Sequence, residues 1–592
     1  MLSKIKLGFS IDSSSIDCCV SIKHWKKLII CQKKLFFVCL AHKYLWSLGS
    51  LALFSRNVVY QFNYLKRKIM KKLLLGAAVS AALFGGAAQA AITLDPATKL
   101  PVITPANTYE IFLSGSSAAG TFFNLLFTSS KLPAANRICD SSKLIYKFHD
   151  TATGGKDQVA YLCELNTANP ALTGLAAGKT NLLIYKRDAG GSGMGVTPVV
   201  ADSAIDFLRV DTPANCTKVS DGVAGISFTK INCTYTAGNV ALSNSQKPDF
   251  GISDVDPIQF QGDNTPSGLA PVTADDVSKL TITPAAAQVF GVVVSTKLRN
   301  AMQEATFGVG SKCVGKEDLS CMPSLNSAQI ASIFTGQISS WDQLKVSGTD
   351  SLFSIASAAN KPVSSRMHIC RRGSGSGTQA QLAIKFMGYP CNSVATQGAV
   401  DNTGIPESLP KAQIHAMSSA GAMEECLSEL NSGSNTVGTS FNNTFTDGAR
   451  WAIGIQGSEK NALRTSAYRF IKIDGVEPTL DKVVRGKYKD WVELTYQYNN
   501  THAWDQSEKE VVDEIIKEAG NPIVMAATNL GAVHSWGKSG FLAAPKFYTG
   551  PATGLVSYDK PVNILSHGTT AASTNNCRMP ATYSTGTGVQ FK

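Results

Sequence analysis

Short Ser- and Gly-rich loops in this chain each stand between an apolar run and a stretch with helical character. Residues 109–113 predict a strand, and the loop 114–117 after them opens a predicted helix over 118–127. Residues 182–185 predict a second strand, which ends at the Gly-rich loop 190–195. Alternation of strand, loop and helix constrains the fold strongly, because it is typical of an α/β architecture.

Two further helices are indicated by their ends. Ser327 is a candidate cap for a helix that Gly336 would stop. Ser507 and Glu510 form a capping-box pattern ahead of an apolar-periodic run that ends at Gly520. The apolar positions of these two helices are Ile330, Ile333, Phe334, Val511, Val512, Ile515 and Ile516, and Val289 to Val294 form another apolar, strand-like run.

A complete secretory signal peptide occupies residues 70–90. Its parts are the basic start Met70-Lys71-Lys72, the apolar stretch 73–86 and the cleavage site Ala88-Gln89-Ala90. We interpret Met70 as the true start and residues 1–69 as a spurious N-terminal extension, and we expect a mature N-terminus at Ala91. The alternative is that residues 1–69 are a membrane anchor, but charged residues interrupt their apolar stretch, which disfavours a spanning helix.

The charge of the chain is concentrated in this leader. The whole chain has 55 Lys and Arg and 43 Asp and Glu, of which residues 1–90 hold 14 and 2. The residues after position 90 therefore contain 41 basic and 41 acidic side chains. A balanced mature chain does not argue for nucleic acid as a partner. The residue directly after the cleavage site is Ala91 and not a lipid-accepting Cys, and no later run is apolar enough to span a bilayer. We therefore expect a periplasmic or secreted protein that is not membrane-embedded.

Ten of the 14 cysteines follow the leader, and an even number in an oxidising compartment predicts disulfides. The absence of any Cys-x-x-Cys pair disfavours a metal site. Pairing of neighbours in sequence is one plausible arrangement, and it would join Cys139 to Cys163, Cys216 to Cys233, Cys313 to Cys321 and Cys370 to Cys391.

The 502 residues after position 90 are too many for one ordinary core, so we expect two or more lobes. Residues 200–245 are rich in Ser, Thr, Asn and Gly and contain two cysteines. We interpret them as a disulfide-pinned insertion within a lobe. Residues 545–592 predict an irregular polar tail.

The Ser/Gly loops share one physical property. After a strand, small residues let the backbone turn sharply, and the helix that follows points free N–H groups outward. Such a helix start carries about half a positive charge and binds anions, while Ser and Thr hydroxyls add donors. The candidate anion-binding residues in these loops are Ser116, Ser117, Ser192, Ser376, Gly377 and Thr378.

Two charged residues complete the candidate site. Arg372 immediately precedes the third Ser/Gly loop, which runs from Gly373 to Thr378. Its planar guanidinium matches a tetrahedral oxyanion. Asp254 lies in the segment Gly251-Ile252-Ser253-Asp254. An ionised carboxylate accepts hydrogen bonds only, so it would favour protonated phosphate over fully deprotonated sulfate.

Each motif also has an ordinary structural interpretation. Gly/Ser loops are common turns, and Gly191 to Gly195 lacks the full dinucleotide-binding pattern. Asp254 with Asp256 could be a cation site or a capped turn. No P-loop Lys, G-x-S-x-G elbow or H-E-x-x-H motif occurs, so we expect no enzymatic activity, no cofactor and no metal.

Taken in order, these segments resemble the periplasmic phosphate-binding proteins of ABC-type uptake systems. The run Ile333-Phe334-Thr335-Gly336-Gln337-Ile338 and the loop from Arg372 to Thr378 are the most specific matches, and the resemblance covers roughly residues 105–525. It implies a two-lobed α/β fold with hinge crossovers that closes over inorganic phosphate or a similar oxyanion. Contacts from Ser116, Ser117, Ser192, Asp254, Arg372, Ser376, Gly377 and Thr378 would hold the anion, and an ABC permease would be the partner. The lobes would be 91–290 (with the 200–245 insertion), 291–454, and a return to the first lobe over 455–592.

Two features depart from that family. Ser374 stands where the family usually has an Asp that pairs with the Arg, and the insertion separates two of the motifs. These departures indicate a divergent branch that binds another oxyanion, or a secreted relative that is not coupled to a transporter. Two alternatives of other classes also stay open. One is a secreted phosphoester hydrolase on the same architecture, and the other is a surface or adhesive protein with a vestigial pocket.

Overall fold

The computed structural model describes residues 92–175, 179–392, 398, 409–438, 441–543, 563–564, 577, 581–584 and 588–591. The predictions for residues 1–69 and for the signal peptide 70–90 lie outside these ranges. Within the described residues, no helix is both long and apolar enough to cross a membrane.

One large mixed sheet forms the centre of the molecule. Its main path runs β15-β14-β16-β10-β19-β9-β1-β4-β3-β2-β7-β6, and β17 (Tyr468–Phe470) and β22 (Phe541–Ala543) also pair with β10. The strands of this path are β1 (Thr108–Gly115), β2 (Tyr146–Asp150), β3 (Gln158–Glu164), β4 (Asn181–Arg187), β6 (Cys216–Ser220), β7 (Thr229–Cys233), β9 (Phe250–Ser253), β10 (Leu280–Ser295), β14 (His368–Arg372), β15 (Gln413–Met417), β16 (Ala452–Gly457) and β19 (Trp491–Asn499).

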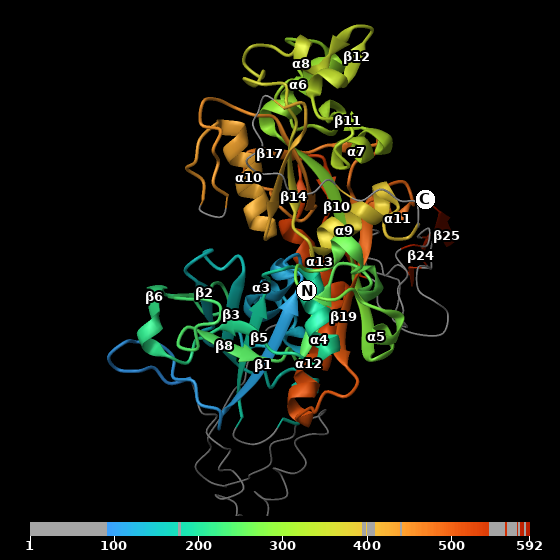
Figure 1. Ribbon diagram of the computed structural model, residues 1–592. Helices are drawn as coiled ribbons and strands as arrows, with labels where there is room; N and C mark the ends of the chain where they lie inside the picture. Colours follow the sequence, from blue (N-terminus) through green and yellow to red (C-terminus); the bar gives the residue numbers. More distant parts are fainter. Residues whose placement is uncertain are drawn as a thin grey trace, which may run out of the picture. The chain divides into compact units, whose positions relative to one another are not determined.

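The 16-residue strand β10 connects two lobes (Figure 1). Its first part pairs antiparallel with β19, whose other neighbour is β9 of the first lobe. Its last part, from Phe290 onward, pairs with β16 and with β17 (Tyr468–Phe470) of the second lobe. The chain enters the sheet of the first lobe again at β19. A single strand shared between two half-sheets makes β10 one of the crossovers between the lobes.

The strands that lie inside the sheet are buried along most of their length. In β1 and β4 nearly every residue is buried, as expected for parallel strands covered on both faces. The helices that cover them include α3 (Gly120–Thr128) and α12 (Gln506–Ala519) in the first lobe, and α7 (Ser327–Phe334), α9 (Gly377–Leu382) and α10 (Ala420–Ser432) in the second.

Helix starts differ by one or two residues from the predicted caps. Asn326, not Ser327, caps α7: its side chain accepts from the Gln329 N–H at 2.8 Å. Asp505 caps α12 by accepting from the N–H groups of Ser507 and Glu508, so the predicted box of Ser507 with Glu510 is wrong. In both places a better side-chain acceptor precedes the predicted cap.

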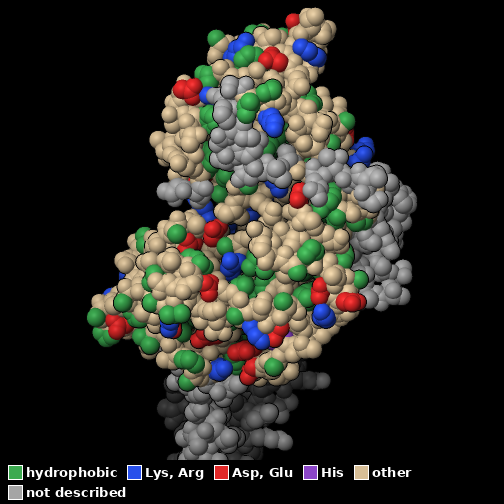
Figure 2. All heavy atoms as spheres, in the orientation of Figure 1, with side chains coloured by type: hydrophobic (Ala, Val, Ile, Leu, Met, Phe, Trp, Pro, Cys, Tyr) green, Lys and Arg blue, Asp and Glu red, His purple; other side chains and the backbone are tan. Residues whose placement is uncertain are grey.

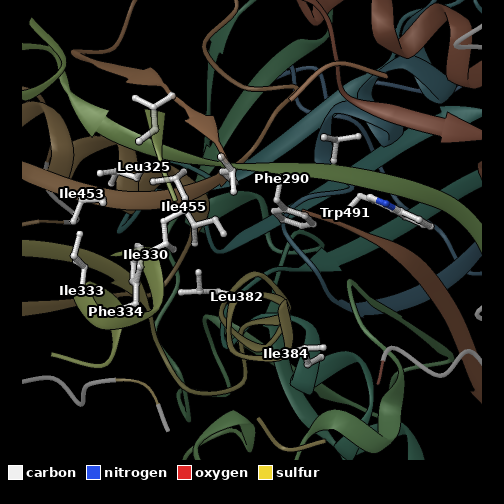
Figure 3. Close-up of a cluster of buried hydrophobic side chains, with 14 of the residues drawn as sticks. Phe290, Leu325, Ile330, Ile333, Phe334, Leu382, Ile384, Ile453, Ile455 and Trp491 are labelled. Atoms are coloured by element: carbon white, nitrogen blue, oxygen red, sulfur yellow. The ribbon is translucent and has the colours of Figure 1, made fainter. Parts of the chain in front are cut away.

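Separate apolar cores support the two lobes. In the first lobe, Phe123, Ile111 and Ile184 from α3, β1 and β4 are fully buried against Ile515 of α12. In the second, residues of α7, α9, β10 and β16 converge on one cluster (Figure 3). The predicted α/β class with two lobes is thus confirmed. Labelled members of the second cluster are Phe290, Leu325, Ile330, Ile333, Phe334, Leu382, Ile384, Ile453, Ile455 and Trp491.

Residues 200–245 add strands to the first lobe. The hairpin β6–β7 joins the sheet because β7 pairs parallel with β2, and Cys216 pairs with Cys233 across it. β5 (Ile205–Leu208) and β8 (Ser243–Gln246) form a small sheet of their own. Short strands also occur in the tail that was predicted irregular: β23 (Asn563–Ile564), β24 (Ala581–Ser584) and β25 (Gly588–Phe591).

Five disulfides join the ten cysteines that follow residue 90. Three predicted pairs are present, namely Cys139–Cys163, Cys216–Cys233 and Cys313–Cys321. The fourth predicted pair is wrong. Cys370 of β14 bonds to Cys426, because α10 packs onto β14 and both cysteines lie in one buried cluster. Cys391 follows α9, which carries the chain away from β14, and it bonds to Cys577.

Candidate functional site

Three loops of the first lobe meet at one edge of the sheet. β1 pairs parallel with both β4 and β9, so the carboxyl ends of the three strands lie side by side. Ser116 and Ser117 follow β1, Ser192 lies in the loop after β4, and Asp254 follows β9. Loops at the carboxyl ends of parallel strands are the usual ligand-binding positions in open α/β sheets.

The second lobe contributes two loops in the same way. β14 pairs parallel with β15, and the chain turns after each strand into a helix, α9 and α10 respectively. Arg372 is the last residue of β14, and Ser376 caps α9 by accepting from the Gln379 N–H at 3.4 Å. Ser419 caps α10 through the Ala422 N–H at 3.2 Å.

Asp254 is the centre of a buried hydroxyl cluster. Ser116 Oγ donates to one carboxylate oxygen of Asp254, and Thr378 Oγ1 donates to the other at 3.3 Å. The backbone N–H of Asp254 donates to Ser192 Oγ at 3.1 Å. Burial raises the pKa of Asp254, although these hydroxyls and the charge of Arg372 oppose the shift. Residues from both lobes therefore contact one carboxylate.

Arg372 reaches from the second lobe toward the first. Its Nη1 lies 3.5 Å from Ser117 Oγ, and its Nη2 donates to the Ser418 carbonyl at 2.9 Å. Burial lowers its pKa to about 10, so it stays protonated at pH 7. Asp254, Asp157 and Asp188 lie close enough to oppose that shift. The negative charge near Arg372 thus comes from carboxylates of the first lobe, since the residue at position 374 is a neutral Ser.

The Gly-rich loops allow the backbones of the two lobes to touch. The Gly193 N–H donates to the Gly375 carbonyl at 2.7 Å. A Cβ at Gly191, whose φ is +69°, would lie 2.8 Å from Ser376 Cα, and a Cβ at Gly377 would lie 2.3 Å from Ser192 Oγ. Side chains at these positions would force the loops apart, so glycine is required here for close approach.

The structure brings all of the sequence-predicted site residues together. Asp256, the other acidic candidate, caps the short 3₁₀ helix Pro257–Gln259 by accepting from the Ile258 N–H, which favours the capped-turn interpretation. No group of three or more His, Cys, Asp or Glu suited to a metal occurs among the described residues. The arrangement offers one buried guanidinium, five hydroxyls and one carboxylate, a set that suits a protonated tetrahedral oxyanion. The eight predicted residues in question are Ser116, Ser117, Ser192, Asp254, Arg372, Ser376, Gly377 and Thr378.

Sequence reasoning missed Lys186 and Asp188. Lys186 Nζ donates to the Ser116 carbonyl at 3.0 Å and forms a buried ion pair with Asp188. Both residues flank the end of β4, just before the predicted Gly-rich loop. A lysine at the end of an otherwise apolar strand was the signal in the sequence that could have identified them.

A cleft of about 210 Å³ opens beside Ser117. Its lining comes from both lobes and includes the start of α3 and the start of α10. Across the face that Figure 2 shows, basic and acidic side chains are interspersed. Its lining residues are Ser117, Gly120, Thr121, Asn124, Lys147, Gly155, Lys156, Val159, Tyr161, Lys186, Asp188, Ser419, Ala420, Gly421 and Lys460.

Comparisons with known proteins find similar solved structures at low identity. An ABC-type phosphate transport receptor from Vibrio cholerae is 12% identical, with a TM-score of 0.31 over 71% of this chain and 98% of the receptor. PstS from Borrelia burgdorferi is 12% identical, with a TM-score of 0.28 over 70% and 95%. A high-affinity periplasmic phosphate-binding protein, PfluDING, is 12% identical, with a TM-score of 0.33 over 72% and 91%. No family model and no curated protein matches the sequence. Since these scores fall below 0.5, the function of this chain is inferred from its own residues.

Proposed function

We propose that this chain is an extracytoplasmic solute-binding protein that holds inorganic phosphate, or a similar tetrahedral oxyanion, between its two lobes. The observation that carries the proposal is the approach of Arg372 from one lobe to Ser117 of the other, within the electrostatic reach of Asp254. An anion bound here would accept charge-assisted hydrogen bonds from this buried guanidinium, and hydrogen bonds of this type are the strong ones.

Asp254 supports phosphate over sulfate. It accepts from Ser116 and Thr378 and has no proton to donate when ionised, so it needs a proton on the bound anion. Phosphate keeps one proton at neutral pH, whereas sulfate has none. The chain would therefore be a divergent member of the phosphate-binding proteins of ABC-type uptake systems, with an ABC permease as its partner.

The lobe boundaries form part of this proposal. The pairing of β17 with the end of β10 favours a return to the first lobe between residue 473 and the start of β19 at Trp491, later than the predicted boundary at 455. The disulfides favour an oxidising location, periplasmic or secreted.

Isothermal titration calorimetry of the chain from Ala91 with phosphate, with sulfate as the control anion, tests the proposal. We expect saturable binding of phosphate and weaker binding of sulfate. A phosphoester turnover assay on the same sample tests the hydrolase alternative, and we expect no turnover. Absence of phosphate binding would refute the proposed function.

A further inference from the structure

The cleft beside Ser117 has more room than a single phosphate ion needs. Its volume of about 210 Å³ compares with the roughly 10–15 Å³ that a cavity needs for one water molecule. It adjoins the proposed anion site directly, because Ser117 lines the cleft and also contacts Arg372. A substituent on a phosphate bound at Arg372 would therefore have space in this direction.

Four lysines line the cleft, three from the first lobe and one from the second. Lys186 pairs with Asp188, Lys156 with Glu425, and Lys460 Nζ lies 3.8 Å from Glu459 Oε1. Asp188 is the one acidic residue in the lining itself. Three of the four ammonium groups are thus at least partly balanced by a carboxylate.

Lys147 differs from the other three. Its Nζ donates to Asn124 Oδ1 at 3.0 Å and lies over the rings of Tyr161 and Phe228, and among the described residues it makes no ion pair. Burial lowers its pKa to about 8, and the charges of Lys186 and Lys460 contribute to that shift, whereas Asp188 opposes it. Burying an ammonium group beside other positive charges costs free energy unless an anion binds next to it.

We propose that the cleft is a second anion subsite, and that the ligand of this protein is a phosphate monoester with a second anionic group that Lys147 binds. The monoester would bind with one proton on its phosphoryl group, because Asp254 accepts hydrogen bonds only. This inference rests on the proposed function, since the phosphoryl group would occupy the site at Arg372. Lys460, from the opposite lobe, lines the same cleft and would contribute positive charge to the same anionic group. Asn124 and Thr121 supply neutral polar groups for the linking atoms of the ester.

Calorimetry with two matched esters tests this inference. 3-Phosphoglycerate and glycerol 3-phosphate are similar in size and share the phosphoryl group, but the first carries a carboxylate as well. In wild type we expect 3-phosphoglycerate to bind about tenfold or more tightly than glycerol 3-phosphate, as one added charge contact provides. In Lys147→Gln we expect that ratio to fall toward one. The ratio cancels any effect of the substitution on the shared phosphoryl group.

Lys345→Gln, an exposed lysine of β12 (Lys345–Ser347), is the matched control and should keep the wild-type ratio. Equal affinities for the two esters, or a preference that survives Lys147→Gln, would overturn the second subsite. Inorganic phosphate, titrated in parallel, separates this result from failure of the proposed function. If phosphate binds and the esters do not differ, the subsite fails alone. If neither phosphate nor either ester binds, both fail.

Discussion

The guanidinium Nη1 of Arg372 lies 3.5 Å from the hydroxyl of Ser117, a residue 255 positions away in the sequence. Arg372 is the last residue of strand β14, and Ser117 lies two residues after strand β1. Each of the two residues precedes the start of a helix. Because one belongs to each lobe, an anion held between them would connect the lobes directly.

Arg372→Ala should abolish most of the phosphate affinity. It removes the buried guanidinium that faces Ser117 and Asp254, and truncating one partner of a buried, hydrogen-bonded charge pair costs about 2–5 kcal/mol. That corresponds to a roughly thirty-fold to several-thousand-fold rise in Kd. Titration calorimetry measures it, with Arg485→Ala, an exposed arginine in an ion pair on the surface, as the control. Wild-type affinity in Arg372→Ala would show that the site is misplaced.

Asp254→Asn should change selectivity more than affinity. An amide offers donors as well as an acceptor, so it no longer repels an unprotonated oxyanion. We expect a moderate loss for phosphate and a relative gain for sulfate, so that the ratio of the two Kd values moves toward one. Parallel titrations at pH 7 give that ratio, and an unchanged ratio would mean that Asp254 does not contact the anion.

The Cys370–Cys426 disulfide should stabilise the fold more than Cys313–Cys321 does. The first closes a loop with a sequence separation of 56 and the second one of 8. The loop-entropy model assigns about 4 kcal/mol to the first and about 2.5 kcal/mol to the second. Urea unfolding of the two double variants, Cys370→Ala with Cys426→Ala and Cys313→Ala with Cys321→Ala, measures the difference. Peptide mapping that finds Cys370 joined to Cys391 would contradict the pairing itself.

Glu518 should make the protein less stable as the pH rises. Burial raises the pKa of Glu518 from 4.5 to about 7, so between these values the folded state holds a proton that the unfolded state has lost. The contribution of Glu518 to the free energy of unfolding is therefore largest below pH 4.5 and falls as the pH rises. Above pH 7 up to about 3 kcal/mol of it is lost.

Glu518→Gln should remove this contribution, and thus raise the free energy of unfolding at pH 8 and change it little at pH 4. Asp513→Asn, at an exposed position of the same helix, controls for the loss of a surface charge. Denaturant unfolding at both pH values provides the comparison. A variant with the same pH dependence as wild type would rule out Glu518 as the source.

Much of the local structure follows from the sequence, because it depends on residues a few positions apart. The apolar run 109–113 and the Ser/Gly loop after it predict β1 and the turn into α3, and both are present. Gly520 ends α12 as expected. The caps at Asn326 and Asp505 were missed by one or two positions, since several polar residues compete at each helix start.

The sequence by itself determined which loops could bind an anion, because a strand, small residues and a helix start produce that property within about ten residues. Only the tertiary structure decided which loops meet. The parallel pairing of β1 with β4 and β9 sets three loops at one edge, and the packing of α10 on β14 selects Cys426 as the partner of Cys370. The lysine cleft was likewise hidden in the sequence. Lys147 and Lys460 are far apart along the chain, and no local pattern relates two residues that the chain topology alone brings to one cleft.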